Sequence, residues 1–176
     1  QRIDTTGAPV LQLVVGHTLP DWNTGEVTSF IQGLGLPFDK VTPEIAHRVK
    51  ANGTYVWEVK NLTQLLHNFH PHGWSFQHIE TEFMDTANPG DPTLNYVVPA
   101  THLENKDTIG LPPRSVVGTS LTISRFAVTF TDAGREGRVA AAGKEPETQR
   151  SGGWLVHCHF LEHAAVGMMS FFQVIE

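Results

Sequence analysis

A single cysteine, Cys158, occurs in this chain, so no disulfide can form within it and cysteine usage does not indicate a redox compartment. No basic run is present, and the formal net charge of −6 argues against nucleic acid as a partner. Apolar runs are all shorter than the roughly eighteen residues that a membrane helix needs, so we expect no membrane span. The chain begins at Gln1 without a signal-peptide pattern, and we expect that any targeting segment was removed or lay upstream.

Long helices are also missing from the sequence pattern. Sixteen glycines and eleven prolines among 176 residues favour many turns, and no apolar period of 3.6 residues is sustained. Short runs rich in β-branched and aromatic residues predict strands instead. These runs are 11–15, 54–61, 75–80, 120–130, 153–159 and 168–176. One short helix is predicted at 160–166, ended by Gly167. The pattern favours an all-β sandwich or barrel.

The chain is long enough for one domain with its own core, and we treat residues 1–176 as a single domain. Residues 1–50 are expected to hold a strand and a long covering loop. The polar, glycine-rich stretch 132–153 has no apolar pattern, which indicates a surface insertion loop. The run 106–115 contains a double proline and suits a sheet edge or a turn.

The single cysteine lies between two histidines. Because side chains alternate along a strand, His157 and His159 should point to one face and Cys158 to the other. His163 follows five residues after Cys158, and Met168 follows five residues after His163. Thiolate, imidazole and a weak thioether are the ligands of a blue, or type 1, copper site, and this set lacks one histidine.

A second histidine segment can supply it. His70 and His72 are two residues apart, and Pro71 between them favours extended backbone, so they should share a face. His67, three residues before His70, takes the opposite parity. We therefore expect His67 to join Cys158, and His70 and His72 to join the histidines that flank the cysteine.

Simpler readings apply to single residues. A lone cysteine is commonly a small buried hydrophobe, but that explains neither the histidine parity nor the methionine. Zinc would fit the histidines and the thiolate, but it rarely recruits methionine. Four further histidines have no partner motif and are expected to be structural: His17, His47, His78 and His102. The glycosylation triplets at Asn52 and Asn61 occur at about the frequency expected by chance.

Both histidine segments resemble motifs of the multicopper oxidases. Residues 67–73 resemble His-x-x-His-x-His-Gly, and residues 157–168 resemble His-Cys-His-x3-His-x3-Gly-Met. Residues 107–113 are similar to the Asp-Thr…Pro-Pro segment between them. The resemblance covers most of residues 50–176 and implies the C-terminal cupredoxin domain, an all-β Greek-key sandwich or barrel with short helical turns. Pro71 and Trp74 replace the commoner leucine and histidine, and neither is a ligand in the family.

The resemblance also implies which residues bind copper. The implied ligands are His67, Cys158, His163 and axial Met168 for type 1 copper, His70 for type 2 copper, and His72, His157 and His159 for the type 3 pair. Cys158, His157 and His159 are the candidate catalytic residues, because the backbone through them joins the two kinds of site.

The resemblance further implies that the cluster needs eight histidines, of which this chain supplies four. The others are expected on a second chain that carries the N-terminal cupredoxin domains, which would make the enzyme a heterodimer; cleavage of one precursor would produce such a pair of chains. The implied activity is laccase-like: phenols or aromatic amines give single electrons at type 1 copper, and dioxygen is reduced to water at the cluster. A secreted, extracellular or periplasmic location is expected.

Other functions share part of this pattern. Metal-ion or bilirubin oxidation would use the same motifs, although only three methionines occur and no methionine-rich segment is present. An electron-transfer cupredoxin would need the type 1 ligands but not His70, His72, His157 and His159. A copper nitrite reductase lacks histidines on both sides of the cysteine. The paired histidines therefore favour the oxidase.

Overall fold

The computed structural model describes residues 1–17, 24, 27, 29–32, 38, 41, 46–114, 120–131 and 154–175. Within these residues, the strands are β1 Val10–His17, β2 Ser29–Gln32, β3 His47–Lys50, β4 Thr54–Asn61, β5 His67–Pro71, β6 Phe76–Asp85, β7 Tyr96–Pro99, β8 Asn105–Lys106, β9 Ile109–Leu111, β10 Ser120–Thr129, β11 Trp154–Cys158 and β12 Met169–Ile175. The helix α1 spans Leu161–Ala165. Every strand predicted from the sequence is confirmed, and so is the short helix.

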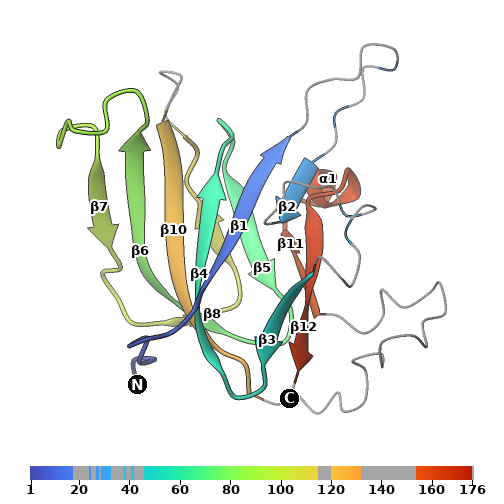
Figure 1. The fold of residues 1–176 in the computed structure, drawn as a ribbon. Helices are drawn as coiled ribbons and strands as arrows, with labels where there is room; N and C mark the ends of the chain where they lie inside the picture. Colours follow the sequence, from blue (N-terminus) through green and yellow to red (C-terminus); the bar gives the residue numbers. More distant parts are fainter. Residues whose placement is uncertain are drawn as a thin grey trace.

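Two sheets form the molecule (Figure 1). The larger has the order β2-β1-β4-β10-β6-β7, with β8 paired to β6, and the smaller has the order β3-β12-β11-β5-β9. The expected all-β sandwich is confirmed. β9 ends the smaller sheet, as the double proline after it predicts. No helix among the described residues is long and apolar enough to cross a membrane.

An aromatic core fills the space between the sheets. Along β4, Tyr55, Trp57 and Val59 are buried while their neighbours are partly exposed, which confirms the predicted alternation. The Trp57 ring lies 5.3 Å from that of Phe69 on β5, and Phe69 stacks at 5.4 Å on Phe126 of β10. These contacts fix β5 against the larger sheet, and β5 carries the first histidine segment.

The pairing of β5 with β11 brings the two histidine segments together. The strands are antiparallel, with His157 opposite His70 and Cys158 opposite Phe69. Because both strands alternate, Cys158 and His67 face the core, whereas His70 and His157 are partly exposed on the other face. The predicted separation of the two faces is confirmed.

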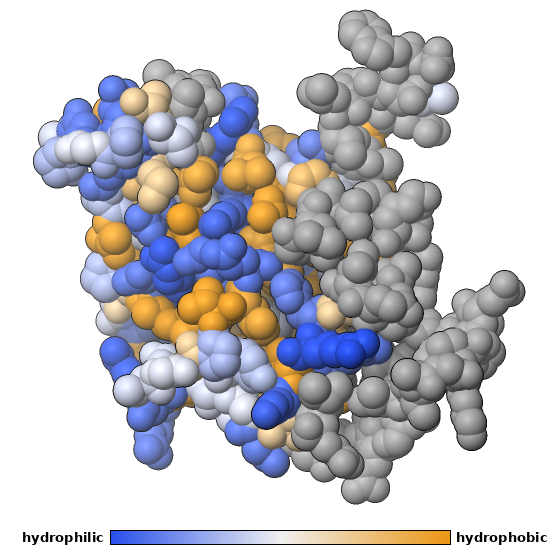
Figure 2. All heavy atoms as spheres, viewed as in Figure 1, coloured by the Kyte–Doolittle hydropathy of each residue, from blue (hydrophilic) through white to orange (hydrophobic). Residues whose placement is uncertain are grey.

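The outer face of the larger sheet carries a charged cluster. Arg125 on β10 contacts Glu58 at 3.0 Å, Glu80 at 2.8 Å and Glu82 at 2.7 Å. Figure 2 shows hydrophilic residues gathered across the middle of this sheet, with apolar surface on both sides. One guanidinium faces three carboxylates, so these four side chains leave the outer face of the larger sheet with negative charge.

Two loops expected from the sequence lie largely outside the described residues. The opening fifty residues contain the expected strand as β1, and also β2 and β3. Most of the expected covering loop lies outside the described residues, and so does the whole of the expected insertion loop at 132–153. Asn61 is fully buried, and its amide donates to the carbonyl oxygen of Leu65, so this triplet serves packing in the fold.

Candidate metal centre

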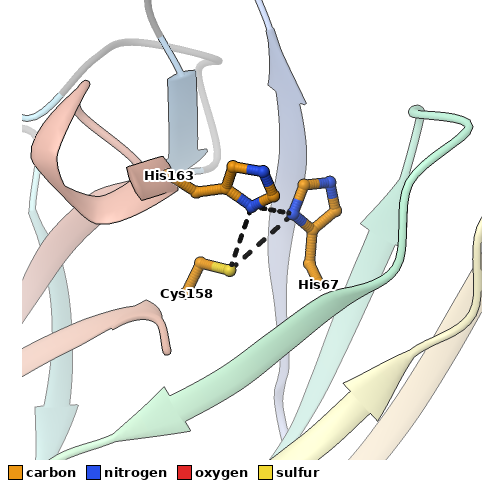
Figure 3. Close-up of side chains that lie close together, drawn as sticks. All are labelled: His67, Cys158 and His163. Carbon is orange, nitrogen blue, oxygen red and sulfur yellow. Dashed lines mark hydrogen bonds between the residues drawn. The ribbon is translucent and has the colours of Figure 1, made fainter. Parts of the chain in front are cut away.

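Three donor atoms from two distant parts of the sequence converge at one end of the smaller sheet (Figure 3). The Cys158 Sγ lies 3.7 Å from the Nδ1 of His67 and 3.5 Å from the Nδ1 of His163. The two Nδ1 atoms are 3.1 Å apart. β5 provides His67, β11 provides Cys158 and α1 provides His163.

This triangle fits a metal ion. Nitrogen and thiolate ligands lie at roughly 2.0–2.3 Å from a transition metal, so donors that share one ion are themselves roughly 3–4 Å apart. A thiolate with two imidazoles in a trigonal arrangement is the donor set of type 1 copper. The distances among His67, Cys158 and His163 have these values. Copper therefore fits the residues that the sequence singled out.

The orientation of His67 is fixed by a hydroxyl on the far side of its ring. The Thr63 Oγ1 lies 2.7 Å from the Nε2 of His67. Thr63 in turn donates from Oγ1 to the Asn61 Oδ1 at 2.8 Å. With its own hydrogen engaged in this way, Oγ1 accepts from Nε2–H, and the Nδ1 lone pair of His67 faces the thiol. Such partners of a metal-binding histidine set its tautomer.

Burial prepares the imidazole as a ligand. Desolvation, with further contributions from His163 and His17, lowers the pKa of His67 to about 3, so the ring is neutral at physiological pH. Burial also raises the pKa of the Cys158 thiol, while backbone hydrogen bonds from Phe160 and Asn68 lower it in part. A metal ion is therefore what would hold Cys158 as a thiolate here.

Met168 closes the loop that carries the other ligands. Its side chain is fully buried in the same core cluster as Cys158. The Met168 N–H donates to the His163 carbonyl at 2.9 Å, and the Cys158 N–H donates to the Met168 carbonyl at 3.1 Å. Gly167 before it has φ +106°, a conformation that favours glycine and ends the helix. Three ligand residues thus share one hydrogen-bonded loop.

A second group of histidines lies on the opposite face of the β5–β11 pair. His70, His72 and His157 offer ring nitrogens that lie within 4.8 Å of one another. His72 Nε2 and His157 Nε2 are 3.0 Å apart. The exposed His159 adjoins the group, with its ring centroid 5.2 Å from that of His70. All four histidines that the sequence assigned to this face are therefore gathered on it.

The rings of this second group are oriented by main-chain acceptors. The Nδ1–H of His70 donates to the carbonyl oxygen of Asp107 at 2.7 Å, and that of His157 donates to the Cys158 carbonyl at 2.9 Å. Each ring then presents its Nε2 lone pair. Burial lowers the pKa of His157, and the neighbouring His70 and His159 lower it further. Imidazoles that present an oriented lone pair are suited to bind metal ions.

The geometry shows three partners that sequence reasoning missed. Thr63 and the Asp107 carbonyl orient ligand rings, but a hydroxyl or a carbonyl carries no recognisable spacing signal. His17 was expected to be structural, yet its ring lies 5.5 Å from that of His67 and 5.6 Å from that of His163. Only the placement of β1 and β5 in space shows that proximity.

Comparison with known proteins gives the family whose motifs the two histidine segments resemble. The sequence matches the protein family described as "Multicopper oxidase" over residues 17–176. The chain belongs to the multicopper oxidase family. A search among curated proteins gave no significant match.

Solved multicopper oxidases share the fold of this chain. McoA from Aquifex aeolicus matches with a TM-score of 0.62 and 22% identity, over 100% of this chain and 31% of that protein. A multicopper oxidase from Campylobacter jejuni, described as a metallo-oxidase, matches with a TM-score of 0.65 and 19% identity, over 96% of this chain and 30% of that protein. A laccase from Pediococcus acidilactici matches with a TM-score of 0.57 and 24% identity, over 99% of this chain and 28% of that protein. The chain therefore spans about a third or less of each of these multicopper oxidases.

Replacement of Met168 tests the axial position of the type 1 site. Met168→Leu conserves side-chain volume, so the free energy of unfolding should fall by less than about 1.5 kcal/mol. The blue absorption should persist, because the thiolate and both imidazoles remain. The reduction potential should rise, because a weak donor that favours Cu(II) is lost. Spectroelectrochemical titration measures this shift, and an unchanged or lower potential would remove Met168 from the site.

Proposed function

We propose that this chain is the electron-accepting part of a laccase-like multicopper oxidase. The observation that carries the proposal is the adjacency of the two groups of donor atoms: Cys158 belongs to one, His157 belongs to the other, and the ring of His159 packs against that of His157. Copper bound at the two groups would supply one-electron oxidation of a donor at the type 1 site and four-electron reduction of dioxygen to water at a cluster. Three consecutive residues, the last two of β11 and the one that follows it, connect these two sites.

Each residue has a role in this proposal. His67, Cys158 and His163 hold type 1 copper, with Met168 as the axial ligand. The second group is assigned from the family motifs: His70 binds type 2 copper, while His72, His157 and His159 bind the type 3 pair. The Thr63 hydroxyl and the Asp107 carbonyl keep one ring of each group in the tautomer that binds metal. Burial of Cys158 and His67 keeps water away from these two ligands.

The remaining cluster ligands should come from outside residues 1–176. Four histidines lie on the cluster face, and a cluster of this family needs eight. The ring of His159 is exposed, and so is that of His72, which leaves the open side of the group accessible to another domain. We propose that cupredoxin domains with the missing histidines cover this face, on a longer form of the same chain or on a second chain.

Apolar side chains around His163 support an organic donor. Phe160 lies 5.5 Å from His163 between ring centroids, and it is 36% exposed. Leu161 and Val166 on the same short segment are 74% and 46% exposed. Glu162 is the one carboxylate of that segment. An aromatic donor can pack against such a surface, whereas a metal ion would need several oxygen or nitrogen ligands.

Anaerobic reduction of the blue band tests the donor class. The copper-loaded protein should be bleached by 2,6-dimethoxyphenol at lower concentration than by Fe(II). Leu161→Asp should weaken reduction by the phenol without slowing reduction by ascorbate, because it removes apolar contact and leaves the ligands in place. Exposed Leu94, in the turn before β7, offers a control substitution, Leu94→Asp. Bleaching by Fe(II) alone would contradict the laccase-like assignment and favour a metal-ion oxidase.

A further inference from the structure

A third imidazole, outside the family motifs, lies against the two imidazole ligands of the type 1 site. His17 ends β1 in the larger sheet, whereas the ligands belong to the smaller sheet and its connections. Its ring centroid lies 5.5 Å from that of His67, tilted by 51°, and 5.6 Å from that of His163, edge-on at 72°. His17 is not one of the three residues whose donor atoms converge. It therefore contacts both imidazole ligands without being a ligand itself.

Ser29 connects this ring to the ligand loop. Ser29 is opposite His17 in the β1–β2 pair, and its Oγ lies 2.8 Å from the His17 Nδ1. The Ser29 N–H donates to the carbonyl oxygen of Val166 at 2.7 Å. Val166 lies between His163 and Met168 in the sequence, so one buried serine holds both the His17 ring and the loop that supplies two ligands.

The second ring nitrogen of His17 makes the residue unusual. Its Nε2 is buried and has no hydrogen-bond partner within the described part of the chain. Burying an unpaired polar atom costs free energy, and phenylalanine would fill a similar volume without that cost. His47 has the same kind of unpaired Nε2, but among the described residues its ring contacts none of the copper ligands. An imidazole at position 17 is thus better explained by the site than by packing alone.

We propose that His17 and Ser29 form a positioning pair that holds the His67 and His163 rings, together with the Val166 loop, in the arrangement that binds type 1 copper. The inference rests on the proposed type 1 site. The hydrogen bond to Ser29 holds the His17 ring in the orientation in which it contacts the two ligand rings, and the Ser29 N–H holds the loop. With the ligands held in place before metal enters, less ordering accompanies binding, so affinity is higher.

The test compares three variants of the full chain. His17→Phe removes the hydrogen bond to Ser29 while it keeps a ring of similar size. Ser29→Ala keeps the His17 ring and removes only the hydroxyl that bonds to it. This variant tests the same hydrogen bond if His17→Phe does not fold. His47→Phe is the matched control, because His47 is likewise a partly exposed histidine whose Nε2 is buried and unpaired. Cu(I) affinity is measured by competition with bicinchoninate, and the blue band and the thermal midpoint of the copper-free protein are recorded.

His17→Phe should weaken Cu(I) binding by roughly 10- to 100-fold, the usual effect of losing a partner that orients metal ligands. Ser29→Ala should shift affinity in the same direction by a smaller factor, and both variants should move the blue band. His47→Phe should leave affinity and the band unchanged. Equal losses in His17→Phe and His47→Phe, or no loss in His17→Phe and Ser29→Ala, would overturn the inference. If the unsubstituted protein formed no blue site, the proposed function itself would fail, which is a separate outcome.

Discussion

Replacing Cys158 by serine is expected to abolish the blue absorption of the oxidised, copper-loaded protein. The intense visible band of type 1 copper requires a thiolate ligand, and Cys158 is the one cysteine of the chain. Its Sγ lies within 3.7 Å of both candidate imidazole donors, so no other side chain can take its place. A serine hydroxyl at the same position is a poor ligand for this kind of copper. Absorption and electron paramagnetic resonance spectra measure the loss.

Val156→Ala is the matched control for this substitution. Val156 lies two residues before Cys158 on β11 and is buried on the same face. The change removes core volume from the same strand, so it should lower stability without loss of colour. A Cys158→Ser protein that stayed blue would show that the type 1 assignment is wrong. Loss of colour in both variants would indicate that the strand, and not the thiolate, had been disrupted.

Replacing His157 by alanine is expected to stop oxygen reduction while the type 1 site still accepts electrons. His157 lies on the face of β11 opposite Cys158, and its Nε2 faces the Nε2 of His72 at 3.0 Å. Since even indirect partners of metal ligands change activity by about 10- to 100-fold, loss of a ligand should slow reoxidation by at least about 100-fold. In stopped-flow experiments on the protein with its full cluster, a one-electron donor should bleach the blue band, and oxygen should fail to restore it.

His102 offers the control for the cluster variant. It is exposed, and it lies in neither of the two donor groups. In His102→Ala, the blue band should bleach with the donor and recover with oxygen as it does in the unsubstituted protein. If His157→Ala lost the bleaching step and the recovery step to the same extent, the two faces of the β5–β11 pair would not have separate roles.

Local sequence rules were enough for much of this site. Alternation along a strand placed His157 and His159 opposite Cys158, and Pro71 pointed to the extended backbone that His70 needs. Both inferences use only residues that are neighbours in sequence. The same is true of α1 and its end at Gly167, whose positive φ marks the turn into Met168. These features were predictable because their causes are local.

Features that depend on long-range pairing were not predictable in this way. The short strands β2 and β3 have little pattern of their own and form because β1 and β12 pair with them. His17 approaches the ligands only because β1 and β5 lie in different sheets that pack together. The Thr63 hydroxyl reaches His67 through a turn whose geometry the sequence does not specify. Register and tertiary packing, not propensity, decide such contacts.

Copper stoichiometry and oxygen uptake of residues 1–176 alone test the central claim most directly. The claim is that the chain holds a whole type 1 site and half of the histidines of a cluster. Expressed alone and loaded with copper, the chain should become blue, retain about one copper after gel filtration and consume no oxygen with a phenolic donor. A soluble monomer that retained roughly four coppers and reduced oxygen to water would contradict the account.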